Sequence, residues 1–143
     1  MLRISDVLAA KPSDVVVTVP PAATVRELVT LLESHNIGAL VVSHDGEAVE
    51  GIVSERDVVR HMTRNADLLE ASVASIMTTD VRVVSPDDTI DETRQLMTDQ
   101  RIRHLPVVVD GKLRGLVSIG DIVKSHIAQV EYERDQLDSY VRS

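Results

Sequence analysis

The sequence predicts a mixed α/β (α+β) protein that contains two copies of one β-α-β-β-α unit. Short β-branched runs alternate with segments of helical periodicity in each copy. An internal repeat is the stronger observation. Its matched positions, at an offset of 65 and then 64 residues, are Pro21 and Pro86, Thr24 and Thr89, Ile37 and Ile102, Gly51 and Gly115, Ser54 and Ser118, and Asp57 and Asp121. A unit of about 60 residues is hardly stable alone, so we expect the two copies to pack together.

The first half of each copy is expected to be a strand followed by a helix. The strands are the runs "DVVVTV" (14–19) and "DVRVV" (80–84), each followed by a proline-containing turn. The helices open with Thr and, three residues later, Glu, at Thr24 and Thr89. This spacing is typical of a capping box, in which both side chains bind main-chain N–H groups at the helix start.

The second half of each copy is expected to be a hairpin followed by a second helix. The paired runs are "ALVVS" with "EGIVS" and "HLPVVV" with "RGLVS", and each pair encloses an Asp-Gly dipeptide. Asp-Gly suits the positive φ angles of a two-residue turn, so both hairpins are predicted to be tight and antiparallel. The second helices are expected to start at Ser54 and Ser118.

The unit boundaries follow from the repeat. We place the first unit in residues 1–65, the second in 66–126 and a helical tail in 127–143. Residues 3–8 resemble 73–77, and we interpret these segments as the lead-in to each copy. In the tail, apolar residues form a seam that Arg134 interrupts: Ile127, Val130, Leu137 and Val141. This seam fits either a terminal helix that packs on its own domain or a short intermolecular coiled coil.

Composition excludes several classes of function. The net charge of −8, the absence of Phe and Trp and the presence of only two Tyr argue against nucleic-acid binding, which needs clustered cations or stacking aromatic rings. The chain has no cysteine, and its histidines lack metal-ligand spacing, so we expect no disulfide and no metal site. No apolar run reaches membrane-spanning length and no secretory signal is evident. We therefore expect a soluble, cytoplasmic protein without a membrane partner.

The stretches "GIVSERD" (51–57) and "GLVSIGD" (115–121) carry the chemistry. Taken alone, Ser-x-x-Asp before an apolar helix is a structural cap. Here, however, a strand runs directly into the helix, which places free N–H groups and a hydroxyl at the strand end and favours an anion. The Asp carboxylate suits a vicinal diol, so we expect a cradle for a nucleoside phosphate that also caps the helix.

These motifs, with "IGALVV" and "IRHLPVV" each followed by Asp-Gly, resemble a tandem pair of CBS domains, a Bateman module, over residues 3 to about 126. The resemblance implies two repeats packed through their sheets about a pseudo-twofold axis. Two clefts between the repeats would then bind AMP, ADP or ATP or, in some members, S-adenosylmethionine or a dinucleotide.

The resemblance also implies roles for individual residues. Asp57 and Asp121 would bind ribose. Phosphate or ribose contacts are expected from Ser54, Ser118, Arg56, Arg103 and His104. The base pocket is expected to contain Val17, Ile37, Ile52, Thr79, Ile102 and Leu116. Arg56 also fits a solvated helix face, and His104 a surface residue.

The copies differ where these cations lie, so we expect the two clefts to have unequal affinities. Gly38-Ala39 stands in the first copy where Arg103-His104 stands in the second, and Gly120 stands in the second where Arg56 stands in the first.

No nucleophile elbow or phosphate-binding glycine loop is present, so we expect no enzymatic activity. We expect a non-catalytic, energy-sensing regulatory module without a cofactor. It would bind an adenine nucleotide, form a homodimer and act on an unknown regulated protein. The alternatives are a nucleotide-independent interaction or scaffold dimer, and a sensor of S-adenosylmethionine or a dinucleotide that uses the same clefts.

Overall fold

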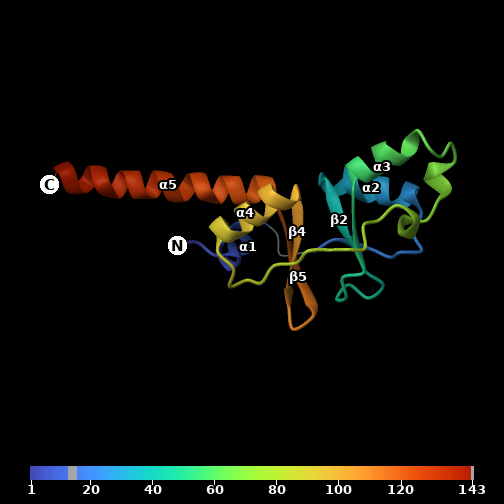
Figure 1. Cartoon of the computed structure of the whole chain (residues 1–143), viewed down its shortest axis with the longest axis horizontal. Coiled ribbons are helices and arrows are strands. Elements are labelled where there is room, and N and C mark those ends of the chain that lie inside the picture. Colours follow the sequence, from blue (N-terminus) through green and yellow to red (C-terminus); the bar gives the residue numbers. More distant parts are fainter. Residues whose placement is uncertain (13–15, 143) are drawn as a thin grey trace.

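The computed structural model describes residues 1–12 and 16–142 and confirms the mixed α/β fold class. Figure 1 shows two globular halves, from one of which a long helix projects. The first part of the chain contains α1 (Ile4–Ala10), β1 (Thr18–Val19), α2 (Val25–His35), β2 (Ala39–Val42), β3 (Gly51–Ser54) and α3 (Glu55–Met62). Two short 3-10 helices follow, η1 (Leu68–Glu70) and η2 (Val73–Ser75). The second part contains α4 (Ile90–Gln100), β4 (His104–Val109), β5 (Lys112–Ser118) and α5 (Ile119–Arg142).

The first strand of each copy is shorter than the sequence predicts. In the described residues of 14–19, only β1 forms; it pairs parallel with β2, and β3 pairs antiparallel on the other side of β2. Residues 14 and 15 lie outside the described part of the chain. The run 80–84 reduces to a single parallel bridge between Val84 and Val107, so its prediction as a strand was wrong. Val84 exchanges hydrogen bonds only with Pro106 and Val108 (3.0 and 2.9 Å), while Val83 is 47% exposed.

Only the second hairpin is tight. Asp110 and Gly111 both have positive φ (51° and 76°), as a two-residue turn between β4 and β5 requires. In the first copy residues 43–50 form a longer loop, so the tight turn predicted there was wrong. The Asp45 carboxylate accepts the N–H groups of Glu47 and Ala48 (2.8 and 2.9 Å) and so organises this loop instead.

The predicted helix starts are present. The Thr24 hydroxyl accepts the Glu27 N–H (3.1 Å) and the Glu27 carboxylate accepts the Thr24 N–H (3.2 Å), which completes the capping box of α2. At α4 the Thr89 hydroxyl accepts the Glu92 N–H (3.1 Å). The helices α3 and α5 start directly after Ser54 and Ser118, as predicted.

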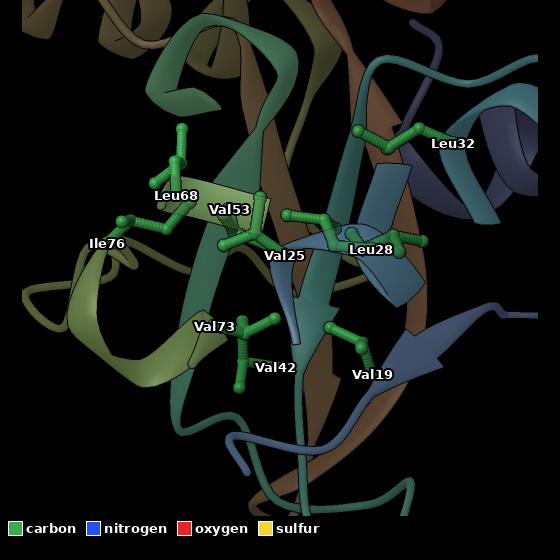
Figure 2. Close-up of a cluster of buried hydrophobic side chains, with 10 residues drawn as sticks. Val19, Val25, Leu28, Leu32, Val42, Val53, Leu68, Val73 and Ile76 are labelled. Carbon is green, nitrogen blue, oxygen red and sulfur yellow. The ribbon is translucent and has the colours of Figure 1, made fainter. Parts of the chain in front are cut away.

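The lead-in segments are exchanged between the copies. Ile4 and Val7 of α1 are buried in the core of the second copy, beside Ile90 and Leu105. The first core, in contrast, contains residues from the segment that precedes the second copy, namely Leu68, Val73 and Ile76. Figure 2 shows these three side chains around the residues of β1, β2, β3 and α2. Each lead-in thus packs on the copy that it does not precede.

The helix α5 extends beyond the folded body (Figure 1). Ile122 is buried, and His126 lies 3.8 Å from Asp91 of α4, so the first turns pack on the second copy. Residues 131–142 are all exposed, which excludes packing on the same domain for that part of the tail. Within residues 1–12 and 16–142, no helix combines the length and the apolar character needed to cross a membrane.

Candidate functional site

A cavity of about 740 Å³ lies between the two copies. The first copy contributes residues 16–17, at the approach to β1, and residues 35–39, between α2 and β2. The second copy contributes His104, residues 114–116 and the start of α5, while the end of α1 closes one side with Leu8, Lys11 and Pro12. Cavities of this volume commonly hold small organic ligands.

The cavity brings together six of the residues that the sequence predicts for a ligand site. These residues are Val17, Ile37, His104, Leu116, Ser118 and Asp121. The polar members belong to the second copy, whereas Val17 and Ile37 come from the first. The remaining predicted residues lie outside this cavity and are Ile52, Ser54, Arg56, Asp57, Thr79, Ile102 and Arg103. Of these, Arg56, Thr79 and Arg103 are exposed.

Both Ser-x-x-Asp motifs form reciprocal helix caps. The Ser118 N–H donates to Asp121 Oδ2 (2.9 Å), and the Asp121 N–H donates to Ser118 Oγ (3.1 Å). Ser54 and Asp57 make the same pair of bonds, at 2.8 and 3.3 Å. All of these carboxylate contacts use Oδ2. Within the described part of the chain, Oδ1 of Asp121 accepts no hydrogen bond, and Asp121 lines the cavity.

Lys11 is a site residue that the sequence reasoning missed. Its Nζ donates to the Leu116 carbonyl oxygen (2.9 Å) and to Asp121 Oδ2 (3.0 Å). The Leu116 carbonyl is free to accept the Lys11 ammonium because Leu116 lies opposite Pro106 on β4. Pro106 has no N–H, and its carbonyl already accepts the Val84 N–H, so Pro106 makes no main-chain hydrogen bond with Leu116. Leu116 therefore directs its main-chain groups away from β4. Lys11 reaches this cavity because α1 packs on the second copy, and no local sequence pattern predicts that packing.

The equivalent edge in the first copy is closed differently. Ile52, the counterpart of Leu116, exchanges two main-chain hydrogen bonds with Thr78 (3.0 and 2.9 Å). The β3 edge at Ile52 is thus occupied by main chain, whereas the β5 edge at Leu116 carries a lysine side chain. The two motifs are alike in sequence but lie in different surroundings.

The surroundings of Asp121 and His104 favour a charged carboxylate and a neutral imidazole. Burial opposes ionisation of Asp121, but the Ser118 N–H and the Lys11 ammonium outweigh it and hold the pKa of the Asp121 carboxyl below its usual value. Burial also lowers the pKa of His104, against the attraction of Asp121 and Glu55. At neutral pH the cavity therefore contains an ionised Asp121 and an uncharged His104. The described residues include no group of three or more His, Asp or Glu side chains placed to hold a metal ion.

Comparison with known proteins identifies the family. The CBS domain model matches residues 4–64 and again residues 73–127. The chain is 38% identical over 124 residues to the mitochondrial CBS domain-containing protein CBSX3 of Arabidopsis thaliana; the match covers 83% of this chain and 60% of CBSX3. This chain thus spans less than two thirds of that relative's length.

Solved structures agree with the fold. The CBS-domain containing protein ATU1752 from Agrobacterium tumefaciens is 40% identical, with a TM-score of 0.80 over 87% of this chain and 98% of that chain. The CBS domain pair of MJ0100, solved in complex with 5′-methylthioadenosine and S-adenosyl-L-methionine, has a TM-score of 0.79 over 90% of this chain and 98% of that chain. It is 24% identical, so this likeness supports the fold alone.

A CBS domain pair is a regulatory module, and the two matches together cover most of the chain. The protein therefore belongs to the CBS domain family and carries two CBS domains in tandem.

Proposed function

We propose that this protein is a non-catalytic regulatory module that binds AMP, ADP or ATP in the cavity that contains Asp121. The observation that carries the proposal is the meeting of three features in one cavity: an available Asp121 oxygen, the start of α5 and an apolar wall. The Asp121 oxygen suits a ribose diol, the start of α5 suits a phosphate, and the apolar wall suits a purine base. Binding between two copies would couple the ligand to their relative arrangement, provided that the ligand favours one arrangement.

Each part of the ligand has a candidate partner. Asp121 Oδ1 would accept hydrogen bonds from the ribose hydroxyls, since Oδ2 is already engaged by Ser118 and Lys11. The apolar wall for the base would comprise Val17, Ile37 and Leu116. His104, uncharged at neutral pH, would serve as a hydrogen-bonding partner rather than as a cation for phosphate.

A second, weaker site is proposed at the motif of the first copy. Its residues would be Ile52, Ser54, Arg56, Asp57, Thr79, Ile102 and Arg103. Asp57 and Ser54 repeat the geometry of Asp121 and Ser118, but the edge at Ile52 is already paired with Thr78. Less main chain is left there for a base, which supports unequal affinities for the two clefts.

Calorimetric titration of the purified chain with AMP, ADP, ATP, NAD and S-adenosylmethionine tests the proposal. We expect at least one of the three adenine nucleotides to bind, and Asp121→Asn to weaken its tighter site. The matched variant Asp57→Asn makes the same change in the other copy and should spare that site. Absence of nucleotide binding, or unaltered binding in both variants, would overturn the proposal.

A nucleotide-independent scaffold is the second candidate, because the helix caps are complete without a ligand. The Ser54 and Ser118 hydroxyls and the Asp57 and Asp121 carboxylates all find partners within their own motifs. In that case the Ser-x-x-Asp motifs would serve helix stability alone. The titration above separates the two functions directly.

We also propose that the protein assembles as a homodimer through its exposed apolar helix faces. Val59 and Met62 of α3 are 64% and 62% exposed. The seam on α5 is exposed at Val123, Ile127, Val130, Leu137 and Val141. Spacing of three and four residues along α5 suits the pairing of two such helices, with Arg134 as its one polar interruption. The regulated protein remains to be identified by its binding to the loaded or unloaded dimer.

A further inference from the structure

We infer that Lys11 and Arg114 make the Asp121 cavity selective for an anionic ligand, a nucleoside phosphate, over neutral or cationic adenosyl compounds. This inference rests on the proposed function and narrows its ligand class. It concerns the charge of one cleft and two residues that lie outside the Ser-x-x-Asp motif.

Lys11 is held on the cavity wall by two acceptors. Its Nζ binds the Leu116 carbonyl and Asp121 Oδ2, and its side chain is 33% exposed. An ammonium group has three N–H donors, so the two contacts made within the described residues leave one donor for a ligand. The same contact neutralises Asp121, which removes the repulsion that a lone carboxylate would exert on a phosphate nearby.

The local charge of the cavity is opposite to that of the whole chain. Among the described residues that line the cavity, Lys11 and Arg114 are basic, and Asp121 is the one acidic residue. The chain as a whole carries a net charge of −8. A cationic concavity in an acidic protein concentrates anions locally, because low-dielectric walls focus the field of the few charges present.

Lys11 and Arg114 are not repeated in the other copy. Arg114 precedes Gly115 as Glu50 precedes Gly51. For Lys11, the register is fixed by main-chain bonds: the Ile4 N–H donates to Asp88, and the Val73 N–H donates to Ala23, the counterpart of Asp88. Counted along the sequence from Ile4 and Val73, Asp80 takes the place of Lys11. At the Ile52 edge itself, the main chain of Thr78 lies where the Lys11 side chain meets the Leu116 edge.

In the sequence, two basic residues of this cleft thus correspond to two acidic residues of the other copy. Glu50 has a partner in its own loop, His44 (2.9 Å), whereas Arg114 lines the cavity. A nucleoside phosphate gains from the cationic cleft, a neutral adenosine does not, and a sulfonium compound is repelled by it.

The test compares AMP with adenosine and S-adenosylmethionine by calorimetric titration. We expect the parent to bind AMP more tightly than the other two ligands. Lys11→Met should lower the ratio of AMP to adenosine affinity by about tenfold, which is the loss of one charge-assisted hydrogen bond. Arg114→Gln should lower it less, and Lys11→Arg should retain most of it. The ratio should also fall as salt is raised, since exposed charges are screened.

Lys112→Met is the matched control. It removes the same charge as Lys11→Met, here from β5, but Lys112 contacts Glu47 (3.9 Å) and does not line the cavity. Its ratio should stay within about twofold of the parent, as expected for a screened surface pair. Circular dichroism of every variant establishes that it is folded.

The possible results distinguish failure of the charge selectivity from failure of nucleotide binding itself. An unchanged ratio in Lys11→Met, or an equal loss in Lys112→Met, overturns the inference while the nucleotide site stands. Tighter binding of both AMP and adenosine by Lys11→Met also overturns it, because Lys11 would then compete with the ligand for Asp121. Failure of the parent to bind any adenine compound overturns the proposed function itself.

Discussion

The Lys11 ammonium lies 3.0 Å from Oδ2 of Asp121, a carboxylate 110 residues further along the chain. This contact exists because α1 packs in the core of the second copy rather than with the copy that it precedes. The same nitrogen also holds the Leu116 carbonyl (2.9 Å). The end of α1, the edge of β5 and the start of α5 thus meet in one cavity, and its charge is set by a residue from outside the repeat motif.

The Lys11–Asp121 contact predicts an acid-dependent loss of stability. The contact and the Ser118 N–H depress the pKa of Asp121 despite its burial. The folded state therefore binds fewer protons than the unfolded state, and the stabilisation is present above about pH 4 and lost as pH falls through the depressed pKa. We expect urea midpoints between pH 7 and pH 3 to fall further for the parent than for Lys11→Met. Parallel curves for the two proteins would contradict this role of Lys11.

His104 predicts a second pH dependence in a higher range. Burial lowers its pKa, so the unfolded chain takes up a proton at about pH 6.5 before the folded chain does. Stability should therefore fall between pH 7.5 and 5.5, and His104→Gln should flatten this part of the curve.

The comparison must be made between the parent and His104→Gln because His44 acts in the opposite direction. The hydrogen bond that His44 donates to the Glu50 carboxylate raises the pKa of His44, and the stability that this bond contributes is lost as pH rises. Thermal melting at the two pH values gives the difference. An equal shift in both proteins would show that His104 is not the group that titrates.

The two motif glycines should differ in their tolerance of a methyl group. A Cβ at Gly51 would lie 2.7 Å from Met77 Sδ and 2.9 Å from the Thr78 carbonyl oxygen, which is fixed by its bond to Ile52. The three atoms nearest to a Cβ at Gly115 would all belong to the Leu8 side chain, the closest at 2.7 Å. We expect Gly51→Ala to cost about 1–3 kcal/mol of the free energy of unfolding, and Gly115→Ala to cost less. Urea denaturation measures both, and the reverse order would contradict the described packing.

The seam on α5 predicts the assembly state. Val130 and Leu137 are 50% and 63% exposed and lie on one face of the helix. If two copies pair along this face, the double variant Val130→Glu with Leu137→Glu should be monomeric in light scattering coupled to size exclusion. Gln136→Glu introduces one such charge away from the seam and should leave the dimer intact. A parent that is monomeric, or a double variant that stays dimeric, would refute pairing through α5.

The repeat pattern was sufficient to predict the fold class, because matched caps, hairpin residues and motifs recur in one order along the chain. Local sequence patterns predicted the structure correctly where local contacts determine it, as in the helix cap at Thr24 and the Asp110-Gly111 turn. They were wrong for the run 80–84, where Pro106 has no N–H with which to extend pairing.

Non-local packing could not be predicted in the same way. Residues 3–8 and 73–77 are short apolar segments that suit either core, and their exchange depends on contacts with residues far along the chain. Lys11 was missed for this reason. Six predicted site residues nevertheless line one cavity, because the strand-to-helix motif fixes the position of Ser118 and Asp121, and the adjoining copy supplies Val17 and Ile37.

Binding of an adenine nucleotide in the Asp121 cavity can be followed by amide chemical-shift mapping of the ¹⁵N-labelled chain during titration with AMP. We expect the amides of Leu116, Ser118 and Asp121 to shift first and saturate, and those of Ile52 and Ser54 to respond only at higher concentration. Amides of Leu116, Ser118 and Asp121 that stay unperturbed at saturating AMP, or that respond after Ile52 and Ser54, would contradict it.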